Sequence, residues 1–158
     1  MNMDKKQRLT LWLELIWWVV TAVVVLAVLY PIHKAMYVWP YEAWNIAFMV
    51  VLITLARYLF LLPHTFLAKQ QEVKVALLIL MFPLTFIMVD ALNGFMVYIE
   101  ENTWDPLTGH LPLAEKNSIE QYIWTQMLFF GMGSCLTPPA FAARLMLSIW
   151  RTRNRGTV

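Results

Sequence analysis

Ionisable side chains inside long apolar stretches are the residues of this sequence best placed to do chemistry. Four occur, namely Glu14, Arg57, Asp90 and Arg144. In the hydrocarbon core of a bilayer each such side chain costs at least about 2.5–3.5 kcal/mol, so it requires a partner, a route to the membrane surface or a function. Asp90 is the best candidate for a functional group, because its short side chain lies too deep to reach the membrane surface.

Asp90 has other polar residues expected near its depth. Asn93 lies three residues further along the sequence and therefore on the same helical face. At a rise of about 1.5 Å per residue, Thr21, Gln126 and Ser134 reach similar depths on other expected helices. This grouping predicts either a hydrogen-bonded lock between helices or a carboxyl that exchanges a proton or a cation. The sequence leaves both roles open.

The other three ionisable residues are expected together near the cytoplasmic membrane face. Counted from the expected helix ends, Glu14, Arg57 and Arg144 all lie about 8–10 Å from that face. An ion pair between Glu14 and one of the arginines, with both arginines reaching toward the surface, predicts a structural clasp between helices. The alternative is the cytoplasmic entrance of an ion path.

The last apolar stretch contains residues that disfavour a regular helix. Gly131 and Gly133 are followed by the pair Pro138 and Pro139. Each proline removes a backbone donor, and its ring clashes with the preceding turn. We therefore expect a kink at the proline pair, or a short unwound stretch over residues 136–138. Such a break serves either helix packing or a transport site.

Composition excludes several classes of protein. The chain of 158 residues is 60% hydrophobic and only 14% charged, whereas about a quarter of the residues of a soluble domain are charged. A net charge of +2 gives no reason to expect a nucleic-acid partner. Cys135 is the single cysteine, so an internal disulfide or a cysteine zinc cage is excluded. The sequence predicts an integral membrane protein.

No reaction or cofactor is indicated. We find no Ser-His-Asp set at matching depths and no phosphate-binding loop, so we predict no catalytic residues and no enzyme. His33 and His64 fall at opposite membrane edges, which disfavours haem held by this chain alone. Met132 and Cys135 are soft ligands for copper, but such residues also fill ordinary cores. We therefore predict neither haem, copper nor another metal.

Four stretches are long enough to cross a bilayer, whose core requires roughly 20 apolar residues. They are expected as helices over residues 9–30, 41–62, 74–99 and 122–150, joined on the outer side by a loop over 100–121. The first helix is expected to end at Pro31. The resulting fold is all-α, a single domain over residues 1–158 built as a bundle of four transmembrane helices.

Basic residues orient this bundle. Eight basic residues at or beyond the ends of the expected spans lie on one side and two on the other. The eight are Lys5, Lys6, Arg8, Lys69, Lys74, Arg151, Arg153 and Arg155, and the two are Lys34 and Lys116. By the positive-inside rule both termini are cytoplasmic. We expect a multi-pass protein of the cell inner membrane.

Three functions are compatible with these features. The first is an accessory or scaffolding subunit of a larger inner-membrane assembly, whose partners are lipid and other membrane subunits or further copies of itself. The second is a small oligomeric channel or proton-coupled transporter that uses Asp90. The third is a redox subunit that binds haem or quinone, with His33 or His64 as ligand.

Overall fold

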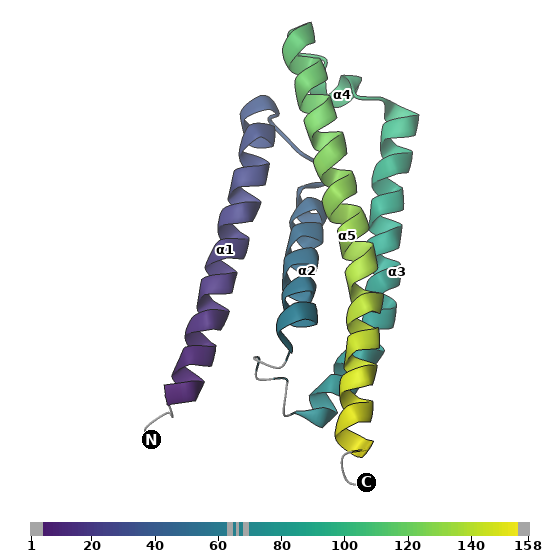
Figure 1. Cartoon of the computed structure of the whole chain (residues 1–158). Coiled ribbons are helices and arrows are strands. Elements are labelled where there is room, and N and C mark those ends of the chain that lie inside the picture. Colours follow the sequence, from purple (N-terminus) through teal and green to yellow (C-terminus); the bar gives the residue numbers. More distant parts are fainter. Residues whose placement is uncertain (1–4, 63–64, 66, 68–69, 155–158) are drawn as a thin grey trace.

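The computed structural model describes residues 5–62, 65, 67 and 70–154 of the chain. This part folds into five helices: α1 (Lys5–Ala35), α2 (Glu42–Leu61), α3 (Gln71–Asn102), α4 (Asp105–Thr108) and α5 (Leu113–Asn154). Four of them are long, and α4 is a single turn (Figure 1). The predicted all-α class is confirmed.

Three helices are long and apolar enough to cross a bilayer. They comprise Leu11–Ala35 of α1, Glu42–Leu61 (α2) and Gln71–Asn102 (α3). By length and hydropathy the chain is therefore a multi-pass membrane protein in contact with lipid.

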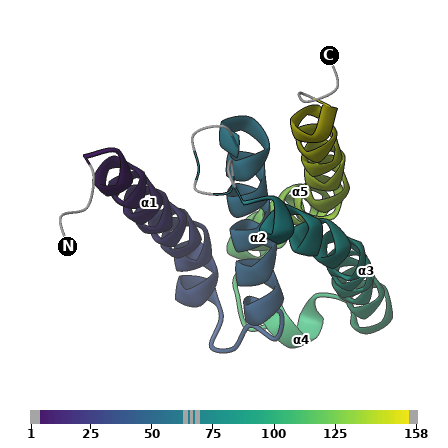
Figure 2. The same ribbon diagram turned by 90° about the horizontal axis from the view of Figure 1, so that it is seen from below.

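The central helix of the bundle is α5. It packs against both α2 and α3, whereas α1 makes weaker contacts with α2 and α5. Figure 1 shows the long helices running alternately up and down, with both chain ends at one end of the bundle and α4 at the other. Seen from below, α1 stands apart on the far side of α2 from α3 (Figure 2).

The short unwound stretch predicted over residues 136–138 is wrong, because α5 is helical from Leu113 to Asn154 with Pro138 and Pro139 inside it. The kink predicted at the proline pair stays a prediction. Burial explains how the helix tolerates the two missing backbone donors. Pro138 is itself buried, and Phe141 and Leu145, which follow it along α5, belong to a buried apolar cluster. Packing on both sides of the prolines keeps the chain helical.

The two glycines allow close helix packing. A Cβ atom at Gly131 would lie 2.6 Å from Cδ1 of Leu92 on α3, and one at Gly133 would lie 2.7 Å from Cδ2 of Leu52 on α2. Small residues at helix contacts let backbones approach closely within a membrane. The glycines therefore fit α5 between its two neighbours rather than breaking it.

Two predicted boundaries are also wrong. Helix α1 continues through Pro31 to Ala35, since Ile32 beyond the proline is fully buried in the core. The outer loop over 100–121 is much shorter than expected, because α3 extends to Asn102 and α5 begins at Leu113. In the early turns of α5, Ile119 and Ile123 are buried against the bundle and hold the helix in place. These turns are therefore amphipathic rather than apolar on all sides.

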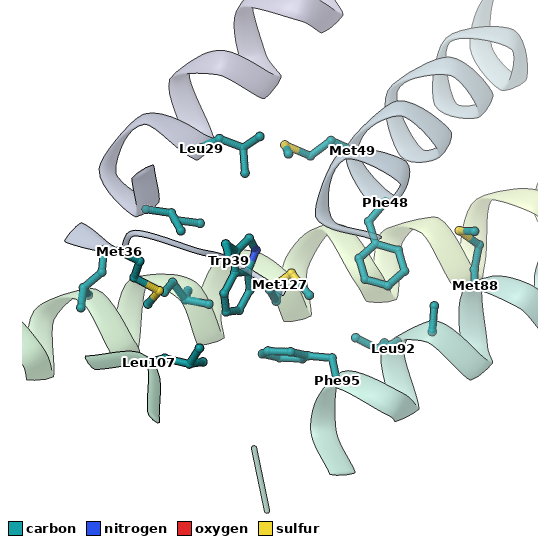
Figure 3. Close-up of a cluster of buried hydrophobic side chains, with 14 residues drawn as sticks. Leu29, Met36, Trp39, Phe48, Met49, Met88, Leu92, Phe95, Leu107 and Met127 are labelled. Atoms are coloured by element: carbon teal, nitrogen blue, oxygen red, sulfur yellow. The ribbon is translucent and has the colours of Figure 1, made fainter. Parts of the chain in front are cut away.

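Two apolar clusters fill the bundle. The cluster at the α4 end, which we call the outer cluster, gathers residues from all five helices and from the connection between α1 and α2. Its members include the labelled Leu29, Trp39, Phe48, Phe95 and Met127 (Figure 3). The inner cluster consists of Leu55, Leu62, Leu67, Met81, Phe141, Ala142 and Leu145. The helices are thus held together by apolar packing along most of the bundle.

The close contact at Gly131 can be tested with Gly131→Leu. Its side chain must displace Leu92, and overpacking of this kind typically destabilises a protein by about 1–3 kcal/mol. We expect a lower thermal unfolding temperature for the purified protein in detergent. Met132→Leu is the matched control, because Met132 is 53% exposed. Equal stability of the two variants would contradict the packing role.

Candidate functional site

Asp90 does not lie inside the bundle. Its side chain and that of Asn93 are exposed on the side of α3 that faces away from the other helices. The inward side of α3 is formed by Met88, Leu92 and Phe95, which are buried in the outer cluster. The helical rotation between these residues and Asp90 turns the carboxyl outward.

The expected grouping around Asp90 is therefore not formed. Thr21, Gln126 and Ser134 are buried, whereas Asp90 is exposed. The hydroxyl of Thr21 donates to the carbonyl of Trp17 at 2.8 Å, and that of Ser134 donates to the carbonyl of Gly131 at 2.7 Å. Each hydroxyl is thus satisfied within its own helix. In the described part of the chain, the side chain of Gln126 has no hydrogen-bond partner.

Asp90 lies close to the middle of a membrane-spanning helix. Helix α3 runs over Gln71–Asn102, so Asp90 is about 5 Å along the axis from its midpoint. Asp90 forms no hydrogen bond or ion pair with any residue that the structure describes.

The surroundings of Asp90 on this surface are apolar. We define the outer face of α3 as a set of exposed residues, namely Ile79, Pro83, Phe86, Asp90, Asn93 and Val97. Phe86 is 73% exposed and Ile79 is 65% exposed. Gly94 beside them is open, since a Cβ atom built there meets nothing within 4 Å. The polar pair thus sits in a surface that otherwise suits lipid or another apolar helix.

A second set of charges joins α1 to α2 near the end of the bundle that carries the termini. Nη2 of Arg57 lies 2.5 Å from Oε1 of Glu14, and the hydroxyl of Tyr58 donates to Oε2 of Glu14 at 3.4 Å. The guanidinium carbon of Arg57 also lies 5.8 Å from the ring centre of Trp17 and 5.1 Å from that of Tyr58. Ion pairing and cation–π contacts together hold the otherwise loosely packed α1.

Arg144 stands apart from this pair. It is partly buried on α5, and its Nε atom has no hydrogen-bond partner among the described residues. The structure thus brings together two of the three charges expected at this depth, Glu14 and Arg57.

Two buried polar residues of the long helices were missed by sequence reasoning. Lys74 was counted among the basic loop residues, yet it is only 1% exposed, and its Nζ donates to Oγ of Ser148 at 3.1 Å. The side chain of Asn45 on α2 is fully buried, and neither of its polar atoms has a hydrogen-bond partner within the described ranges. An amide in the apolar stretch over 41–62 was the only sequence signal for Asn45.

The short helix α4 fastens the end of the bundle opposite the chain termini. Nζ of Lys116 donates to Oδ1 of Asp105 at 2.5 Å, and this hydrogen bond raises the pKa of Lys116, which therefore stays cationic at neutral pH. The hydroxyl of Thr108 donates to the carboxylate of Glu120. The hydroxyl of Tyr122 reaches the carbonyl of Val28 on α1 at 2.9 Å. These bonds tie α4, α5 and α1 together.

A shallow groove of about 520 Å³ opens between α1 and α5 at this end. It is lined by apolar residues and by Lys34, Glu115 and Ser118. Lys34 and Glu115 give the groove one charge of each sign, and the residues that line it do not form an arrangement typical of a catalytic centre.

The residues considered for cofactors are dispersed. Nε2 of His33 lies 3.4 Å from Oε1 of Glu42. A further histidine, His110, lies elsewhere, with its Nε2 3.0 Å from the carbonyl oxygen of Ala35. His64 lies outside the described residues. Met132 is exposed, and Cys135 is partly buried. Among the residues that the structure describes, no group of three or more His, Cys, Asp or Glu side chains is placed to hold a metal ion.

No protein family, curated protein or solved structure matches this chain.

The pair between Glu14 and Arg57 can be tested with a double-mutant cycle. Glu14→Gln leaves the guanidinium of Arg57, which is 7% exposed, without its counter-charge, and we expect a loss of about 3 kcal/mol in the free energy of unfolding. Adding Arg57→Met should recover part of this loss, because no buried charge then remains. The measurement is denaturant unfolding of the purified protein in detergent.

Glu42→Gln is the control for this cycle. The partner of Glu42 is His33, and both side chains are about half exposed, so the expected loss is below about 1 kcal/mol. Strictly additive effects of Glu14→Gln and Arg57→Met would contradict the coupling.

Proposed function

We propose that the protein is a structural subunit of an assembly in the cell inner membrane, joined to neighbouring membrane proteins through the outer face of α3. Its four long helices all span the bilayer, and both termini are cytoplasmic. Three features support this proposal: the surface of α5, the positions of the basic residues and the exposure of Asp90.

The surface of α5 supports a fourth span. Every exposed residue between Phe129 and Trp150 is apolar. This stretch is about 32 Å long, close to the thickness of a bilayer core. The same helix packs against α2 and α3, both of which are apolar enough to cross. A central helix needs fewer strongly apolar residues, since much of its surface contacts protein rather than lipid.

The basic residues support cytoplasmic termini. Arg151 and Arg153 lie in the last turn of α5, at the same end of the bundle as the start of α1, where Arg8 lies (Figure 1). Four antiparallel crossings place both termini on one side, and the positive-inside rule assigns that side to the cytoplasm.

The observation that carries the proposed function is the position of Asp90 with Asn93. A carboxyl and an amide face outward near the middle of α3, where lipid tails offer no hydrogen-bond partner. The alternative of snorkelling to the surface is not open to a side chain as short as aspartate at this depth. Burial of this face against another transmembrane helix gives both groups polar partners.

Transport is the weaker second role. Two apolar clusters occupy the core between the described helices, and Asp90 faces away from both of them. A proton or ion path that uses Asp90 would therefore run between this chain and a neighbour. Even this role requires the protein contact on α3 that we propose.

In-cell photo-cross-linking tests the association. A photoreactive amino acid replaces Phe86 at the midpoint of α3, and the matched control replaces Val23, which is 59% exposed midway along the span of α1. Because the outer face of α3 contacts protein, we expect position 86 to give protein adducts and position 23 to give mainly lipid adducts. Adducts to lipid alone at position 86 would contradict the proposed function.

A further inference from the structure

We propose that the helix covering the outer face of α3 is α3 of a second copy of this chain. The inference rests on the proposed function, since it names the neighbour that satisfies Asp90. It follows from the spacing, the hydrogen-bonding groups and the open space on this face.

The spacing along the outer face suits a pair of parallel helices. From Ile79 to Val97 its residues follow one another at alternating intervals of four and three. This is the heptad spacing at which two helices keep one seam in contact along their length. Two copies inserted in the same orientation present parallel α3 helices, related by a two-fold axis along the membrane normal.

The polar pair is complementary to itself. The carboxyl of Asp90 accepts hydrogen bonds, and the amide of Asn93, one turn away on the same seam, donates them. In a parallel two-fold pair, Asp90 of each copy lies at the level of Asp90 of the other copy and less than one turn from its Asn93. The amide of each Asn93 then donates to the carboxyl of the other copy, so one contact is made twice. A polar residue at one position of such a seam also fixes the register and the number of helices.

Gly94 gives the two helices room to approach. No other described residue packs against the position where its side chain would be, because a Cβ atom built there would meet nothing within 4 Å. Its carbonyl accepts a hydrogen bond from the hydroxyl of Tyr41 at 3.0 Å, which fastens this part of α3 to the start of α2. Close backbone approach beside an interhelical hydrogen bond is typical of helix pairs in membranes.

Disulfide trapping in native membranes tests the pairing. The full chain carries Cys135→Ser, which removes the only cysteine, together with Phe86→Cys or Val97→Cys on the seam. Val23→Cys on α1 is the control. On mild oxidation we expect dimers of twice the chain mass for both seam variants and none for the control.

The polar pair is tested by adding Asn93→Leu or Asp90→Leu to the Phe86→Cys chain. Both replacements place an apolar side chain on an exposed surface, so the fold should persist, as unchanged thermal unfolding of the monomer would show. Loss of the reciprocal hydrogen bonds should lower the cross-linked fraction roughly 3- to 10-fold. Co-purification of two differently tagged copies should fall in parallel.

The possible outcomes separate this inference from the proposed function. Seam cysteines or photoprobes that join only to a different protein would overturn the second copy and leave the proposed function standing. No protein adduct on the seam by either chemistry would overturn both. Equal dimer yield at position 23, or a yield unaffected by Asn93→Leu and Asp90→Leu, would also overturn the pairing.

Discussion

Lipid tails cannot form hydrogen bonds with polar groups, and this constraint governs the structure. Several polar side chains in the apolar helices are satisfied within the chain, whereas the buried amides of Asn45 and Gln126 have no partner among the described residues. Glu14 and Arg57 neutralise each other, and the hydroxyls of Thr21 and Ser134 bond to the backbone of their own helices. Asp90 differs, because its position on α3 turns it away from every neighbouring helix. The same constraint that explains the internal pairs therefore points outside the bundle at Asp90.

The bundle is organised around α5. Two glycines bring this helix close to α2 and α3, and apolar residues continue the packing beyond its prolines. Helix α1 depends more on individual polar contacts, with the Glu14–Arg57 pair at one end and the Tyr122 hydroxyl at the other. The faces of α3 and α1 that point away from the bundle remain open to the membrane. Of these two, only α3 combines an apolar surface with a polar pair near the middle of its span.

Sequence reasoning predicted the helices better than the contacts between them. Long apolar stretches are a local property, so α2 was expected over residues 41–62 and is found at Glu42–Leu61. The continuity of α5 and the amphipathic start at Leu113 depend on what the neighbouring helices bury, which no local pattern records. Depth estimates placed Glu14 and Arg57 together, and the two side chains form an ion pair. Depth does not define rotation about the helix axis, and for this reason Asp90 was grouped with residues that it does not meet.

The environment of the outer face of α3 is measured most directly by electron paramagnetic resonance in lipid bilayers. A nitroxide is attached at Phe86→Cys in the Cys135→Ser chain, with Val23→Cys as the lipid-facing reference. A face covered by protein at mid-membrane predicts slow collision with a water-soluble nickel complex, and slower collision with oxygen at position 86 than at position 23. Oxygen collision as fast as at the reference would mean that lipid covers Asp90, and rapid collision with nickel would mean that water does. Either result would contradict a protein contact at this face.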